Sequence, residues 1–171
     1  MLTTTLNRIR EHNPCLLRWK KLLKHLGKTQ PDDEPLTYLT ILESNGLDDA
    51  LWCCSVEPKY DKEWRLYAVW CARRVQHLMT DPRSLKALDV AEAYAYGNAS
   101  DEELKEVRIA ARAARVVAEE SAWAAWAAWV VAEESARAAV WTARVVARNV
   151  MEISDEWAAQ TEEFKRIITL G

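Results

Sequence analysis

Two cysteine–histidine pairs in the chain have the residue types of a nucleophile and its base. Cys15 follows His12 by three residues, and His77 follows Cys71 by six. Nucleophilic catalysis requires such a pair in hydrogen-bond contact, in a cleft, with a further group that orients the base. On predicted helices these spacings are ordinary coincidences, and the sequence contains no glycine-rich phosphate loop. We therefore predict that the protein is not an enzyme.

Metal and cofactor sites are not indicated either. Cys53 and Cys54 are adjacent, which is not a structural zinc spacing, and the three histidines stand alone. The acidic residues do not follow a calcium-loop pattern. We expect no metal and no cofactor, and we expect the four cysteines to be reduced thiols.

Acidic residues follow a basic block in the sequence. Residues 1–30 contain seven bases and one acid, and residues 31–60 contain seven acids and one base. An acidic surface could dock on the basic cleft of a nuclease by matching its potential. Capping of helix N-termini is the alternative; it explains Asp48 and Asp49 well and the tandem Asp32-Asp33-Glu34 only partly. The candidate partner-binding residues are Asp32, Asp33, Glu34, Asp48, Asp49 and Trp52.

The basic block is the alternative surface. It could contact phosphate or an acidic partner, or it could be the solvated side of two amphipathic helices. The net charge of −3 argues against a general nucleic-acid-binding protein. The alternative basic residues are Arg8, Arg10, Arg18, Lys20, Lys21 and Lys24.

Turn-forming residues divide the chain unevenly and predict an all-α fold. All five prolines lie at or before Pro82, and no Gly or Pro occurs between Gly97 and Gly171. We expect a compact multi-helix bundle with short helices first and long Ala/Trp-rich antiparallel helices afterwards. The expected short helices include one with Leu16, Trp19, Leu23 and Leu26 inward and Gly27 at its end, one over 36–43, one over 61–79 with Leu78 inward, one starting at Asp81-Pro82, and one with a capping box at Ser100–Glu103.

The second half contains a degenerate repeat. The sequence VVAEESA at 116–122 recurs at 130–136, and 14 residues are close to four helical turns. One straight helix over 101–150 would be about 75 Å long, whereas a compact chain of this size is about 40 Å across. We therefore expect a break at Glu-Glu-Ser 119–121 or 133–135 or at Arg148-Asn149, antiparallel packing through a seam of small residues, and a last helix capped by Ser154. The seam is Val107, Ala111, Ala114, Ala118, Ser121, Ala125, Ala128, Ala132, Ser135 and Ala139, flanked by Trp123, Trp126, Trp129 and Trp141.

The length of 171 residues predicts one domain over 1–171, with subregions 1–98 and 99–171. The first residues lack an apolar core of signal-peptide length, and the longest uncharged run, at 121–132, is too short to span a bilayer. We expect a cytoplasmic protein.

Several sequence motifs resemble one family. They are Asn13-Pro14-Cys15, LGKT at 26–29, DDEPL at 32–36, LESNGLDDALW at 42–52, RLYAVWCAR at 65–73 and ALDVAE at 87–92. Together they resemble the small all-helical immunity proteins of bacterial polymorphic toxin systems, which have similar proteins in phage and prophage genomes. The resemblance implies a helical protein that binds and neutralises a toxin, without implying a mechanism.

These observations lead to one functional hypothesis and two alternatives. The hypothesis is a non-enzymatic inhibitor that neutralises a bacterial toxin or a defence effector by covering its surface, as immunity proteins and anti-CRISPR proteins do. The alternatives are a self-assembling helical scaffold, in which the alanine seam packs between chains, and a nucleic-acid-binding protein. The hypothesis assumes a rigid helical body without a reactive pocket.

Overall fold

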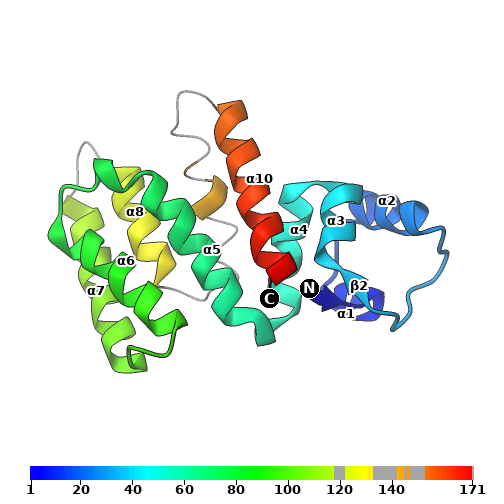
Figure 1. The fold of residues 1–171 in the computed structure, drawn as a ribbon, viewed down its shortest axis with the longest axis horizontal. Coiled ribbons are helices and arrows are strands. Elements are labelled where there is room, and N and C mark those ends of the chain that lie inside the picture. Colours follow the sequence, from blue (N-terminus) through cyan, green and yellow to red (C-terminus); the bar gives the residue numbers. More distant parts are fainter. Residues whose placement is uncertain (118–121, 133–141, 145, 147–152, 171) are drawn as a thin grey trace.

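The computed structural model describes residues 1–117, 122–132, 142–144, 146 and 153–170 (Figure 1). The predicted all-α class is confirmed, since the strands of this part are two antiparallel segments of two residues each. The described elements are β1 Thr3–Thr4, α1 Leu6–Glu11, α2 Leu16–Leu26, β2 Leu36–Thr37, α3 Tyr38–Asn45, α4 Leu47–Cys53, α5 Asp61–Arg74, α6 Pro82–Ala95, α7 Asp101–Val117, α8 Ala122–Val131 and α10 Ile153–Leu170, with short 3₁₀ helices at Cys54–Val56, Pro58–Tyr60 and Gln76–Leu78.

The helix ends that were predicted from local motifs are confirmed. Gly27 ends α2 in the left-handed region at φ 66°, where a side chain would be strained. Asp81 accepts a hydrogen bond from the Arg83 amide (2.9 Å) at the start of α6. In the capping box before α7, the Glu103 amide donates to Ser100 Oγ (3.2 Å) and the Ser100 amide donates to Glu103 Oε2 (2.7 Å).

The helix expected over 36–43 begins two residues later than predicted. Leu36 and Thr37 pair with Thr4 and Thr3, which holds them in extended conformation. The side chain of Thr37 then accepts a hydrogen bond from the Thr40 amide (3.0 Å) and caps α3. The early start was wrong because this pairing joins residues more than thirty positions apart and leaves no local pattern.

Two later boundaries also differ. The helix expected over 61–79 ends at Arg74, and Leu78, expected inward, is 43% exposed on the 3₁₀ helix that follows. A 3₁₀ turn holds about three residues instead of 3.6, so the inward face of α5 does not continue to Leu78. The last helix, α10, begins at Ile153, one residue before the expected cap at Ser154.

One continuous apolar core joins the N-terminal helices to α5 and α10. Its largest fully buried side chains are aromatic: Trp64 and Tyr67 on α5, Tyr38 on α3 and Phe164 on α10. The Trp64 and Phe164 rings are stacked with centroids 6.1 Å apart. Helix α10 lies between α5 and the N-terminal helices, so both ends of the chain contribute to the same core (Figure 1).

The predicted packing of one part of the Ala/Trp segment against another is confirmed for α7 and α8, whereas the break predicted at Glu-Glu-Ser 119–121 falls on residues that the structure does not describe. Only four residues separate these helices, and they pack side by side, which requires an antiparallel arrangement (Figure 1). The described seam residues are buried, namely Val107, Ala111, Ala114, Ala128 and Ala132. Trp126 and Trp129 lie partly buried beside them. Trp123 lies on α8, but its side chain is not described, and the predictions for Trp141, Glu-Glu-Ser 133–135 and Arg148-Asn149 fall outside the described residues.

Candidate functional site

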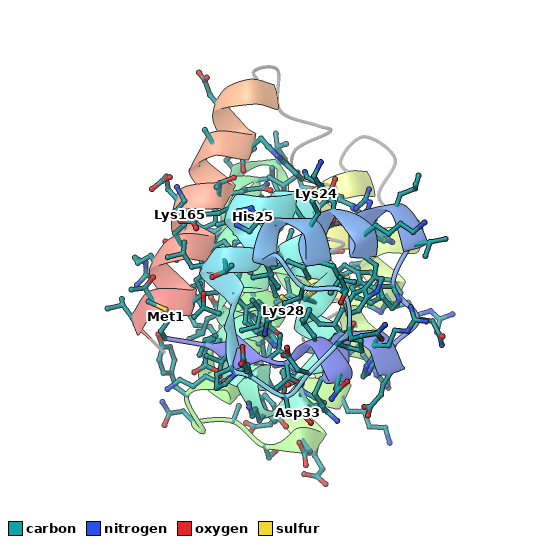
Figure 2. All side chains as sticks on the ribbon, turned by 90° about the vertical axis from the view of Figure 1, so that its right-hand side faces the viewer. Met1, Lys24, His25, Lys28, Asp33 and Lys165 are labelled. Atoms are coloured by element: carbon teal, nitrogen blue, oxygen red, sulfur yellow. The ribbon has the colours of Figure 1, made fainter. Side chains whose placement is uncertain are left out.

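The acidic loop that follows α2 is tied to a lysine of its own chain. Lys28 Nζ donates to carboxylates of both Asp32 and Glu34. This contact lowers the pKa of Asp32 and raises the pKa of Lys28. The Asp32 carbonyl also accepts the Asn7 amide of α1 (3.0 Å). Asp33 is exposed on the same loop and has no ion pair with a described residue (Figure 2).

The acidic residues of α4 pair with basic side chains. Asp49 is buried and forms an ion pair with Arg18 of α2, whose pKa is raised by that hydrogen bond. Asp48 Oδ1 accepts from Arg144 Nε (3.2 Å). Trp52, half-buried, lies on the same helix. The structure thus brings Asp48, Asp49 and Trp52 near each other on α4, and it places Asp32, Asp33 and Glu34 on a separate loop.

The two charge blocks of the sequence therefore partly neutralise each other, through three of the seven bases. Arg8 approaches Glu57 within 3.6 Å, in addition to the Arg18–Asp49 and Lys28–Asp32 pairs. What remains exposed of the basic block, without an ion pair to any described residue, is Arg10, Lys20, Lys21 and Lys24; Arg10 instead lies over the Trp19 ring at 5.8 Å. The uncompensated charge of this end of the molecule is therefore mainly the lysine side of α2.

Helix α2 also exposes apolar residues. Leu16 is 58% exposed and Leu17 is 79% exposed, whereas Trp19 and Leu22 of the same helix are buried. The prediction that Leu16 faces the core was wrong, because no element of the described part of the chain covers that side of the first turn. We name the exposed set the α2 face; it consists of Leu16, Leu17, Lys20, Lys21 and Lys24. Figure 2 views this side of the molecule, with α2 across its upper half.

A pocket of about 340 Å³ lies beside the N-terminal end of α2. We name it the α2 pocket. Its walls come from α1, α2, α3, α4 and Arg144. Because these segments are far apart in the sequence, no local pattern indicated the pocket. Its lining residues are Ile9, Pro14, Cys15, Arg18, Trp19, Leu22, Ile41, Asn45, Asp49, Trp52, Cys53 and Arg144. Two of the predicted partner-binding residues, Asp49 and Trp52, belong to this lining.

The polar groups of the pocket wall bind each other. Asn45 Nδ2 donates to Asp49 Oδ2 (2.7 Å) and to the Arg18 carbonyl (3.0 Å). Asn45 Oδ1 accepts from Ser44 Oγ (2.7 Å). Both oxygens of Asp49 are occupied, since Arg18 binds Oδ1. The amide and the carboxylate on this wall are therefore already satisfied.

The cysteine and the histidine of each predicted pair lie in different environments. Cys15 is exposed before the first turn of α2, and the backbone amide of Arg18 lowers the pKa of its thiol. His12, at the C-terminal end of α1, has its Nδ1 atom 3.0 Å from the carbonyl oxygen of Arg8 in the same helix. Cys71 is buried, which raises the pKa of its thiol, while His77 is exposed. Among the described residues, no three His, Cys, Asp or Glu side chains form a group that could hold a metal ion.

A second hollow of about 360 Å³ lies between α5, the end of α6 and α10. Charged residues border it, including Arg73, which pairs with Glu92, and Arg166, which pairs with Glu163. It contains none of the residues that the sequence indicated.

Comparison with known protein families, with curated proteins and with solved structures found no match for this chain. Within the described residues, none of the helices has the length and apolar character needed to cross a membrane.

Proposed function

We propose that the protein is a non-enzymatic inhibitor that binds a bacterial toxin or a defence effector and neutralises it by covering part of its surface. The observation that carries this proposal is the α2 face, where two exposed leucines adjoin lysines that have no ion pair with a described residue. Exposed apolar residues with a polar surround are typical of protein interaction sites. The predicted acidic residues support the proposal less, since Lys28, Arg18 and Arg144 already hold most of them.

The charge of the α2 face indicates an acidic partner. Lys20, Lys21 and Lys24 lie on one side of the helix, and their charges attract a partner surface of opposite sign and increase the association rate. The leucines supply the apolar contact that a charged rim alone does not give. This combination also favours a protein partner over a nucleic acid, because phosphate binding requires no exposed leucines.

Self-assembly through the alanine seam has less support. Ala111, Ala114, Ala128 and Ala132 are buried between helices of one chain and are not available to a second copy. Light scattering tests this alternative, since a scaffold forms oligomers at tens of micromolar protein.

The test is capture of a partner by the tagged chain, followed by an activity assay on the purified partner. Leu17→Asp places a charge in the α2 face, and Ile109→Asp is its matched control because Ile109 is 61% exposed on α7. We expect the control to bind normally, and we expect Leu17→Asp to bind at least about tenfold more weakly, as loss of one central contact does. The unmodified chain should inhibit the partner at equimolar concentration.

Three results would contradict the proposal. Equal binding by both variants would exclude the α2 face. A captured partner whose activity is unchanged by the chain would exclude inhibition. Weakened binding on reversal of Asp32, Asp33 and Glu34, with Leu17→Asp unaffected, would return the interface to the acidic loop.

A further inference from the structure

We propose that the α2 pocket receives one large apolar side chain, aromatic or long aliphatic, from an acidic segment of a protein partner. This inference rests on the proposed function and extends it by naming what the partner inserts. The occupant follows from three properties of the pocket: its size and lining, the state of its polar groups, and the charge around its opening.

The size and lining fit a side chain. The volume of about 340 Å³ is at the lower end of the range for ligand pockets, roughly 300–1,000 Å³. Ile9, Leu22 and Ile41 supply aliphatic surface, and Trp19 and Trp52 supply indole rings. Interface energy concentrates where one aromatic or aliphatic anchor fills such a pocket.

The state of the polar groups disfavours a polar occupant. Asn45 uses both amide hydrogens and its carbonyl oxygen within the chain, and Asp49 uses both oxygens. A polar ligand would have to break these bonds, and the buried groups left without partners would weaken its binding. An apolar side chain leaves the whole network in place.

The charge around the opening selects an acidic neighbour for that side chain. Arg18 is 52% exposed and uses one guanidinium nitrogen for Asp49, so its other N–H groups can reach a carboxylate at the opening. Arg144, which also lines the pocket, is 39% exposed and supplies a second guanidinium there. An apolar anchor flanked by Asp or Glu therefore matches this surface better than one flanked by Lys or Arg.

Blocked peptides test the inference without the partner. The probe is Ac-Asp-Trp-Asp-NH₂, with Ac-Asp-Ala-Asp-NH₂ and Ac-Lys-Trp-Lys-NH₂ as controls. We expect saturable NMR shifts of the Trp52 indole N–H with a dissociation constant of about 1 mM or tighter, as one side chain of this size supports. Bound probe should also shield Cys15, and at about nine times the dissociation constant alkylation of its thiol should slow about tenfold by mass action.

Variants locate the binding. Cys15→Phe narrows the pocket opening at an exposed position and should abolish the shifts, whereas Lys20→Phe, on the same helix but outside the lining, should retain them. Equal binding of the alanine probe, or unchanged binding by Cys15→Phe, would overturn the inference. Shifts confined to Trp70 and Tyr96, which line the second hollow, would overturn it as well.

The outcomes separate this inference from the proposed function. If a partner is captured through Leu17 but the peptides do not bind, the pocket is empty in the complex and only the inference fails. If the peptides bind as expected but no protein is captured and inhibited, the pocket recognises apolar side chains and the proposed function fails.

Discussion

Removal of the Asp49 carboxylate tests whether the two charge blocks are joined in solution as they are in the structure. Asp49 links α4 to α2 through Arg18 and to α3 through Asn45. We predict that Asp49→Ala destabilises the protein, and that Asp33→Ala, which removes an exposed carboxylate without an ion pair to a described residue, does not.

The expected magnitude follows from the exposure of each partner. The hydrogen bond from the Asn45 amide to a buried carboxylate is charge-assisted, and such bonds contribute about 1.5–3 kcal/mol. The Arg18 pair contributes less, about 0.2–1 kcal/mol, because Arg18 is 52% exposed and water screens the interaction. We therefore expect Asp49→Ala to lower the free energy of unfolding by about 2–3 kcal/mol, and Asp33→Ala to change it by less than about 0.5 kcal/mol.

Urea denaturation followed by tryptophan fluorescence measures both values. A double-mutant cycle with Arg18→Met isolates the ion pair, and we expect a coupling free energy of at most about 1 kcal/mol. If Asp49→Ala were as stable as Asp33→Ala, the Asp49 carboxylate would not bridge the three helices in solution. The polar wall of the α2 pocket would then not be satisfied in the way described above.

Three further predictions follow from other parts of the molecule. In the folded protein, alkylation should modify Cys15 and leave the buried Cys53, Cys54 and Cys71 unmodified until denaturant is added. The reaction of Cys15 should persist to lower pH than that of an ordinary thiol, because the Arg18 amide lowers its pKa. Peptide mass spectrometry measures both results. By carboxyl NMR titration Asp32 should have a pKa below the usual value for an aspartate, and Lys28→Met should raise that pKa while Lys20→Met leaves it unchanged. Trp64→Ala should lower the free energy of unfolding by about 3–5 kcal/mol, since it empties the centre of the aromatic core, whereas Leu78→Ala, on a 3₁₀ helix at the surface, should cost less than about 1 kcal/mol.

The sequence predicted those features that depend on neighbouring residues. Gly27 ends α2, Asp81 starts α6, and Ser100 with Glu103 starts α7, because a cap is formed by backbone groups within four positions of the capping residue. The burial of Ala111 and Ala128 follows from a seven-residue spacing that is likewise local. The helical class of the fold could therefore be predicted with no knowledge of which helices touch.

Features that depend on distant contacts were not predictable from these patterns. Arg18 and Asp49 are 31 positions apart, so the sequence shows a basic block and an acidic block but not their pairing. Leu16 has the spacing of a core residue, yet it is exposed because none of the described helices packs over the first turn of α2.

The internal neutralisation of charge also decides which surface can recognise a partner. A carboxylate that is already neutralised by an ion pair gains less from a second cation, so Asp32 and Asp49 gain little from a basic partner. Lys20, Lys21 and Lys24 have no ion pair with a described residue to give up on binding, and burial of Leu17 adds roughly 1.5–3 kcal/mol of apolar transfer. These contributions occur together on one helix. An acidic partner that also supplies an apolar anchor therefore gains more binding free energy from the α2 face than from the acidic loop.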